Sequence, residues 1–145
     1  MIKLGRRGSV RRRVAASGGY ARDVEPLGEV RTEAGGDKIE VVVLSGEHDL
    51  GTVPKVRDAL GAAAVNTNAV IVDLCAATFV DSSILGAMLE ARRAAIEANR
   101  GFAVACDGAS EPVRRVLEVT GLAEELPVHA TREAALAAVG AREKP

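Results

Sequence analysis

Apolar and polar residues from position 28 onward follow two periods in turn, one typical of β-strands and one typical of α-helices. The runs at 38–44 and 69–74 are rich in β-branched residues and almost wholly apolar, which predicts strands buried on both faces of a sheet. Three shorter segments are also expected to be strands, and Ala34-Gly35-Gly36-Asp37 is expected to form a hairpin turn between the first two. The five predicted strands span 28–33, 38–44, 69–74, 102–106 and 126–128.

Four segments between or after these strands carry apolar residues at helical spacing. Each begins at or after a residue that caps helix N-termini well. Thr52, Ser110 and Thr131 are the expected caps of three of them, and the other begins at Ser82 or Ser83, where Asp81-Ser82-Ser83 provides the cap. The predicted buried faces consist of Val53, Val56 and Leu60 in the first helix, Leu85, Met88, Leu89 and Ile96 in the second, and Leu136 and Val139 in the last. Strands that alternate with helices predict an α/β fold, with a mixed, mostly parallel sheet of four to five strands and about four helices.

The first 24 residues have no apolar periodicity, and their charge differs from that of the rest. Seven basic and no acidic side chains lie in residues 1–22, which leaves residues 23–145 with 12 basic and 20 acidic residues and a net charge of −8. We expect residues 1–24 to be a disordered tail and residues 25–142 to form one domain. Two other interpretations of the tail stay open: an electrostatic anchor, in which Arg6-Arg7-Gly8-Ser9 also resembles a basophilic kinase site, or a start codon placed too early.

Composition narrows the classes of partner. Aromatic residues make up 2% of the chain, too few for the stacking platforms of proteins that bind single-stranded nucleic acids. The acidic charge of residues 23–145 disfavours DNA and anionic lipid as the main partner and favours a basic protein surface. No stretch has the ~18 consecutive apolar residues of a membrane span, and the N-terminus has no apolar h-region, so we expect no secretion signal. Two cysteines, Cys75 and Cys106, are too few for a disulfide framework, so we expect a cytoplasmic protein.

Two polar segments follow predicted strands at the end of the sheet where functional groups of open α/β folds gather. One is Ser45-Gly46-Glu47-His48-Asp49, expected to be a loop after the second strand, and the other is Thr78-Phe79-Val80-Asp81-Ser82-Ser83 after the third. If these strands pair, Asp49 and Asp81 lie close together, with the two serines at a helix N-terminus. One polar residue is enough to cap a helix, so three in a row exceed the structural need.

Three segments match the motifs of one known family in order and spacing, over about residues 27–140. Asp81-Ser82-Ser83-Ile84-Leu85-Gly86-Ala87-Met88-Leu89 is similar to a D-S-S-x-L-G-x-L signature. Ser45-Gly46-Glu47-His48-Asp49-Leu50 is similar to an S-G-E-x-D-L segment, and Arg114-Arg115-Val116-Leu117-Glu118-Val119-Thr120-Gly121-Leu122 to an R-R-V-L-E-x-T-G-L segment. The chain therefore resembles STAS domains, in particular the bacterial anti-sigma factor antagonists.

The resemblance implies a STAS-like fold and a switch between partners. In these antagonists the partner, which is both an anti-sigma factor and an ATP-dependent serine kinase, phosphorylates one serine after the signature's aspartate. The unphosphorylated form binds that partner and frees a sigma factor, and a phosphatase resets the antagonist. Carried over by position, the phosphoacceptor is Ser82 or, less favoured, Ser83. The implied partner-binding residues are His48, Asp49, Asp81, Ser82, Ser83 and Ile84.

The chain departs from the family pattern at two of these positions. Ile84 replaces the glycine of many members and adds bulk beside the phosphoacceptor, and His48 replaces an aliphatic residue. We expect His48 to be an exposed loop side chain or a polar contact to the partner. Some STAS domains are not phosphorylated, so the alternative is a non-catalytic scaffold of a stress-signalling assembly or a cytoplasmic partner of a lipid transporter. Weak membrane contact through the basic tail would suit the transporter partner.

The residue pattern also argues against an enzyme. Ser82 lies at a strand-to-helix turn, but its segment is not G-x-S-x-G, and of the two histidines only His48 is near enough in the predicted topology to act as a base. There is no Walker A loop and no G-x-G-x-x-G, so we expect the kinase chemistry to come from the partner. Cys75, Cys106 and His48 lack the spacing of zinc ligands. We therefore predict a binding protein without catalytic residues, cofactor or metal.

Overall fold

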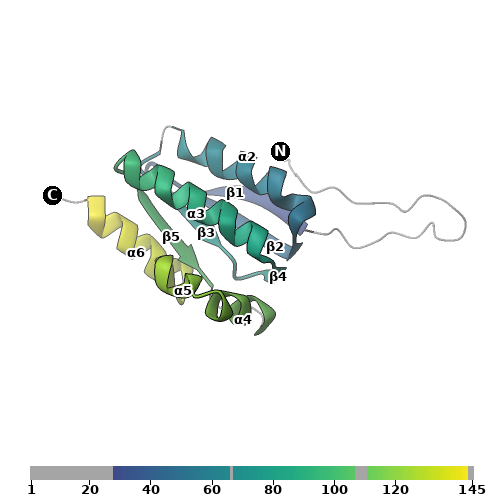
Figure 1. The fold of residues 1–145 in the computed structure, drawn as a ribbon. Coiled ribbons are helices and arrows are strands. Elements are labelled where there is room, and N and C mark those ends of the chain that lie inside the picture. Colours follow the sequence, from purple (N-terminus) through teal and green to yellow (C-terminus); the bar gives the residue numbers. More distant parts are fainter. Residues whose placement is uncertain (1–27, 66, 107–110, 144–145) are drawn as a thin grey trace, which may run out of the picture.

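The computed structural model describes residues 28–65, 67–106 and 111–143. The predicted tail, 1–24, and the predicted helix cap Ser110 lie outside these residues. One sheet is covered by helices on both faces (Figure 1). Its strands are β1 (Gly28–Gly36), β2 (Ile39–His48), β3 (Ala69–Asp73), β4 (Ala77–Val80), β5 (Gly101–Ala105) and β6 (Val128–His129). The helices are the 3₁₀ turn η1 (Leu50–Thr52), α2 (Val53–Ala64), α3 (Ser82–Glu97), α4 (Glu111–Val119), α5 (Leu122–Glu125) and α6 (Arg132–Glu143).

The sheet is mixed and mostly parallel, as predicted. Its strand order is β1-β2-β3-β5-β6, with β1 antiparallel to β2 and the other described pairs parallel. β6 lies at an edge, which confirms the predicted edge strand, although it begins two residues later than expected. The carbonyl of Pro127 still accepts a 3.0 Å hydrogen bond from the Val104 amide, because a proline lacks a donor but keeps its acceptor.

A sixth strand, β4, is not predicted by the hydrophobic pattern. β2 has ten residues and β3 has five, so the carboxyl end of β2 extends beyond β3. The chain turns at 74–76, and β4 then pairs with that end of β2. Thr78 and Phe79 are both exposed, so β4 has neither the strict alternation nor the continuous apolar run by which strands are recognised. The segment 45–48, expected to be a loop, is the last part of β2.

Two apolar clusters enclose the sheet, one on each face. Because successive strand residues point to opposite faces, Val42 and Leu44 join the larger cluster with α2, α3 and α4, while Val41 and Val43 join the smaller one with α6. Figure 1 shows α2 and α3 side by side across the sheet face that carries the larger cluster. Among the described helices, none is long and apolar enough to cross a membrane.

Two local predictions about turns and helix faces are wrong. The hairpin turns at Asp37 and Lys38 instead of 34–37, and Lys38 adopts a left-handed φ of 61°. Ile96 is 57% exposed although it shares a helical face with Leu85. Burial along this face falls from Leu85 through the half-buried Leu89 to Ile96. In the last turns of α3 the buried residue is Ala95, which lies about 100° away from Ile96 around the helix axis.

The predicted helix caps have different outcomes. The Thr131 hydroxyl accepts a 2.9 Å hydrogen bond from the Ala134 amide, which confirms it as a cap of α6. Thr52 occupies the N-cap position of α2 but makes no capping hydrogen bond. The one-turn helix α5 was not expected; it follows Gly121, whose left-handed φ of 76° ends the preceding helix as predicted.

Candidate functional site

The carboxyl ends of β2 and β4 bring Asp49 and Asp81 together. His48 and Val80 are register partners in these two parallel strands, and each aspartate follows one of them. The Asp81 amide donates a 3.2 Å hydrogen bond to the His48 carbonyl, so the ladder continues up to the start of α3. Paired strands lie about 4.8 Å apart, so the backbones of the two aspartates are neighbours. Their predicted proximity is confirmed, although β4 provides it and not β3.

Asp81 is the N-cap of α3 and holds one of the two serines. Its Oδ1 atom accepts hydrogen bonds from the amides of Ser83, at 3.0 Å, and Ile84, at 3.2 Å. These bonds satisfy two of the donors that a helix N-terminus leaves without partners. The same oxygen accepts a 2.5 Å hydrogen bond from the Ser83 hydroxyl. Ser83 is half-buried, and its hydroxyl proton is therefore engaged by the cap.

Ser82 is in a different environment from its neighbour. It is exposed at the first position of α3, and its hydroxyl makes no hydrogen bond to any residue that the structure describes. The positive end of the helix dipole lies at this position, where it stabilises added negative charge. Ser82 therefore offers an accessible hydroxyl where a phosphate can be tolerated without unfolding the helix.

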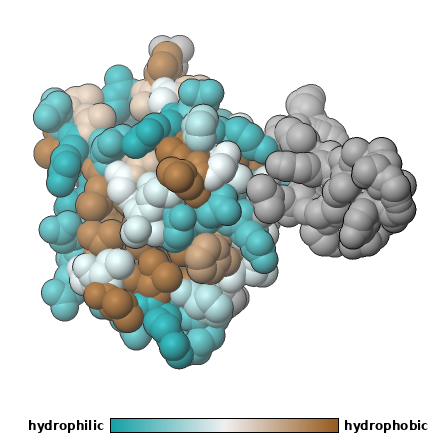
Figure 2. All heavy atoms as spheres, turned by 45° about the vertical axis from the view of Figure 1, so that its right-hand side comes forward, coloured by the Kyte–Doolittle hydropathy of each residue, from teal (hydrophilic) through white to brown (hydrophobic). Residues whose placement is uncertain are grey.

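Asp49 organises the neighbouring turn. Its Oδ1 atom accepts a 2.9 Å hydrogen bond from the Gly51 amide, and its carbonyl accepts one of 2.9 Å from the Thr52 amide. The turn leaves Leu50 71% exposed, and Phe79 on β4 is 37% exposed. The surface at this end of the molecule thus combines acidic and apolar side chains, and Figure 2 shows such apolar patches among polar ones. Sequence analysis did not assign Leu50 or Phe79 to the site, because exposure of an apolar side chain leaves no sequence signal.

His48 is buried, with 0% of its surface exposed. Its Nε2 atom lies 3.0 Å from the Ser45 carbonyl, which can only accept, so Nε2 carries a proton. Nδ1 lies 3.0 Å from the Thr52 hydroxyl oxygen, and the same hydroxyl donates a 3.1 Å hydrogen bond to the Asp49 carbonyl. Both ring nitrogens of His48 therefore have a polar neighbour inside the domain.

The environment of His48 overturns two expectations. Burial lowers the pKa of His48, and the carbonyls of Ser45 and Glu29 oppose that shift only in part. The expectation of an exposed loop side chain or direct partner contact is wrong, because the ring is inside the domain. A hydrolase in which His48 activates Ser82 has no support either, since both ring nitrogens are engaged elsewhere.

Ile84 is also fully buried, at 0% exposed. Its side chain belongs to the larger apolar cluster under α2 and α3. The expectation that it adds bulk beside the phosphoacceptor and contacts a partner is therefore wrong for its side chain. What it contributes to the site is its amide, which donates to Asp81.

Gly28 lies directly against the His48 ring, a contact that the sequence did not predict. A Cβ atom at this position would lie 2.4 Å from the Glu47 carbonyl oxygen and 2.6 Å from His48 Nε2. Only glycine allows β1 to approach the His48 ring this closely. The start of β1 thus helps to close the pocket that keeps His48 neutral.

Cys75 and Cys106 follow the neighbouring strands β3 and β5, as expected, and both are half-buried and form no disulfide within the described residues. Within the described ranges, no three His, Cys, Asp or Glu side chains are grouped so that they could hold a metal ion.

No curated protein matches this chain. Among solved structures, an anti-sigma factor antagonist from Mycobacterium paratuberculosis is 29% identical, with a TM-score of 0.67 over 77% of this chain and 92% of the other. The Bacillus cell fate determinant SpoIIAA in its phosphorylated form is 24% identical, with a TM-score of 0.58 over 76% of this chain and 98% of the other.

The same fold occurs in a sulfate transporter family protein from Wolinella succinogenes. That protein is 16% identical, with a TM-score of 0.61 over 76% of this chain and 91% of the other. Identities this low, like that of SpoIIAA, show a shared fold and nothing about function. The model of the STAS domain family matches residues 34–135, which include all of β2 to β6 and the corner formed by Asp49, Asp81 and Ser82. The chain therefore belongs to the STAS domain family.

Proposed function

We propose that this STAS domain is an anti-sigma factor antagonist that regulates transcription by partner switching in a stress response. Unphosphorylated, it binds an anti-sigma factor that is also an ATP-dependent serine kinase, and the sigma factor is released. The partner phosphorylates Ser82, which ends the interaction, and a phosphatase restores the first state. The domain supplies a binding surface and a phosphoacceptor, and the partner supplies the catalysis.

One observation carries this proposal: the exposed Ser82 hydroxyl at the N-terminus of α3, beside two aspartates. A kinase must reach the hydroxyl oxygen and remove its proton. Ser82 meets this requirement, whereas the proton of Ser83 is held by Asp81 in a 2.5 Å hydrogen bond. The geometry thus favours Ser82 over Ser83 as the phosphoacceptor.

Phosphorylation changes the charge of the docking surface without removing its cap. A phosphate adds a charge of about −1.5 to −2 near neutral pH. Two unit charges about 6 Å apart repel by about 3 kcal/mol at an effective dielectric constant of about 20, and solvent exposure reduces this value. A loss of about 2.7 kcal/mol weakens binding about a hundredfold. The partner is therefore released while α3 stays folded.

The test is phosphate transfer from labelled ATP by candidate kinases of the same genome, followed by mapping of the modified residue. We expect Ser82→Ala to abolish transfer and Ser83→Ala to retain it, although Ser83→Ala loses one hydrogen bond to the cap. Phosphorylated protein should bind the kinase about a hundredfold more weakly than Ser82→Ala does. A difference of less than about tenfold would contradict the proposed switch.

The alternative function is a STAS scaffold or transporter-associated module that is not phosphorylated. It predicts no transfer of phosphate to either serine by any candidate kinase. In that case the acidic and apolar corner would still serve as a docking surface, and binding would not depend on ATP.

A further inference from the structure

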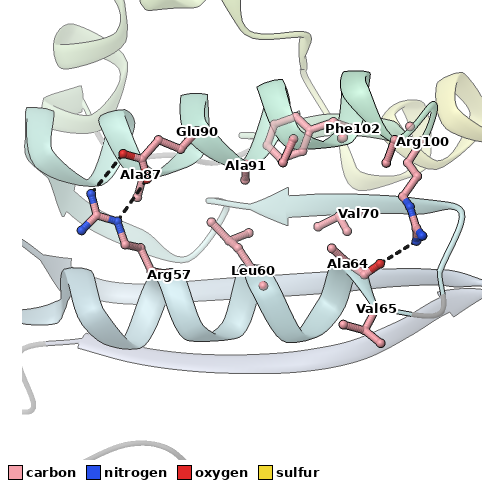
Figure 3. A pocket seen from close by; sticks show the side chains of 15 residues that line it. Arg57, Leu60, Ala64, Val65, Val70, Ala87, Glu90, Ala91, Arg100 and Phe102 are labelled. Atoms are coloured by element: carbon pink, nitrogen blue, oxygen red, sulfur yellow. Dashed lines mark hydrogen bonds and ion pairs between the residues drawn. The ribbon is translucent and has the colours of Figure 1, made fainter.

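The space between α2 and α3 forms an elongated groove that the proposed switch does not use (Figure 3). Its volume is about 620 Å³, within the range of about 300–1,000 Å³ that small-molecule sites occupy. Leu60 and Ala64 of α2 and the alanines of α3 form its walls, and Val70 and Phe102 of the sheet form its floor. The groove is therefore largely apolar.

The shape of the groove follows from the sequence of α3 and the residue that follows it. Ala87, Ala91, Ala94 and Ala98 recur at helical spacing and all line the groove. Small side chains on this stripe leave space that leucine would fill at an ordinary helix contact. From Ala87 to Ala98 the helical rise gives a length of about 16 Å, so an unbranched apolar chain fits better than a compact ring system.

The two ends of the groove differ in charge. At one end Arg57 and Glu90 pair with each other through hydrogen bonds of 3.2 and 3.3 Å, which neutralises both. At the other end Nη1 of Arg100 donates to the carbonyls of Ala64, at 2.6 Å, and Thr67. These carbonyls lie at and beyond the last turn of α2, so the guanidinium is held in place.

The remaining donors of Arg100 are available. Its Nε and Nη2 atoms make no hydrogen bond to any residue in the described ranges, and the group is permanently charged. These two nitrogens form the side of the guanidinium that binds the two oxygens of a carboxylate in parallel. An apolar groove with one uncompensated cation at its end is complementary to an apolar chain that ends in an anion.

We propose that this groove binds a fatty acid. The acyl chain lies along the alanine stripe between α2 and α3, and the carboxylate accepts hydrogen bonds from Nε and Nη2 of Arg100. Burial of the chain supplies most of the affinity, and Arg100 selects an anionic head and sets the direction of binding. The site is separate from the Ser82 corner and does not depend on the proposed phosphorylation.

The first test compares dodecanoate with 1-dodecanol, which has the same chain without the charge, on the full chain below the micellar concentration of each. Amide chemical shifts of α2 and α3 report binding. We expect dodecanoate to bind about tenfold or more tightly than the alcohol, and Arg100→Gln to remove that preference. Equal affinities for the two ligands in the unmodified protein would overturn the proposal.

A second variant avoids the structural role of Arg100. Ala91→Leu fills the groove and should keep or raise the urea midpoint, because it fills a cavity, while it lowers dodecanoate affinity about tenfold or more. The matched control is Ala137→Leu on the exposed side of α6, which should bind as the unmodified protein does. Unchanged binding by Ala91→Leu would refute the site. A different result would assign the groove to a second copy of the chain. In that case the unmodified protein self-associates, Ala91→Leu abolishes the association, and dodecanoate does not affect it.

Discussion

The Ser82 hydroxyl and the His48 imidazole lie near the same two aspartates but in opposite environments. Ser82 is exposed and makes no hydrogen bond to the described residues, so another molecule can reach it. His48 is fully buried and paired through both nitrogens, so it can neither take a proton from Ser82 nor contact a partner. At the scale of single residues, this contrast supports the proposed role of Ser82 as a phosphoacceptor for a partner kinase.

Asp81 combines a structural and an electrostatic role, which two substitutions separate. Asp81→Ala removes the acceptor of the Ser83 and Ile84 amides, and we expect the free energy of unfolding to fall by about 1 kcal/mol. Asp81→Asn keeps an acceptor oxygen, so stability should change little while affinity for a basic partner surface falls. Urea unfolding and binding to the anti-sigma factor measure the two effects. Equal stability losses in both variants would contradict the capping role.

His48 should make the stability of the domain depend on pH. Its pKa lies below the ordinary value of 6.5, mainly because burial disfavours the charged imidazolium. As pH falls below 6.5, the unfolded chain takes up a proton that the folded chain does not, so stability is lost. We expect the urea midpoint to decrease from about pH 8 to about pH 5.5, and His48→Gln to remove most of this decrease.

The other histidine supplies the control for this measurement. His129→Gln should retain the pH dependence of the unmodified protein, because His129 lies on the edge strand β6, away from the buried pocket. A flat midpoint over the same pH range in the unmodified protein would show that His48 is protonated equally in the folded and unfolded states.

At the scale of elements, a cluster of charged side chains connects α6 to the sheet through ion pairs and hydrogen bonds. Arg132, the first residue of α6, donates 2.8 Å hydrogen bonds to Asp73 on β3 and to Glu33 on β1. Burial raises the pKa of Asp73, but hydrogen bonds from Cys75 and Arg132 outweigh it and hold that pKa below 3.8. The hydrogen bond from Arg132 likewise lowers the pKa of Glu33 below 4.5. The cluster therefore stabilises the fold through two ionised carboxylates.

Arg132→Gln should lower the free energy of unfolding by about 2 kcal/mol near neutral pH, since it leaves the buried Asp73 carboxylate without its cation. Both carboxylates have lowered pKa values, so their contribution is present above about pH 4.5 and is lost as pH falls through the folded-state values. The deficit of the variant should thus shrink in acid. Arg31→Gln, which removes a more exposed partner of Glu33, should cost about 0.5 kcal/mol and serves as the control.

The order of strands and helices could be predicted from the sequence, but the element that completes the site could not. The apolar runs behind β2 and β3 and the caps at Asp81 and Thr131 are local signals, and the structure retains them. β4 has no such signal, because its pairing depends on how far β2 extends beyond β3. The burial of His48 depends on Gly28 in a different strand, a contact that no local pattern specifies.

For the molecule as a whole, charge is divided unevenly along the chain. Residues 1–22 carry seven basic side chains, and residues 23–145 have a net charge of −8. The acidic part includes Glu47 and the corner formed by Asp49, Asp81 and Ser82, where addition of a phosphate makes the charge more negative. The basic part precedes β1 and lies outside the family match. We therefore expect docking and any attraction to anionic lipid to belong to different parts of the chain.

Deletion of residues 1–24 tests this separation. The urea midpoint should be unchanged, because the two apolar clusters are formed by residues of the described domain. Affinity for the kinase should change by less than about tenfold and Ser82 should still be phosphorylated, because the docking corner remains complete. Sedimentation with anionic vesicles measures the lipid attraction of the basic segment. Loss of vesicle binding in a protein that no candidate kinase phosphorylates would favour the transporter-associated alternative, and a lower urea midpoint would contradict an independent domain.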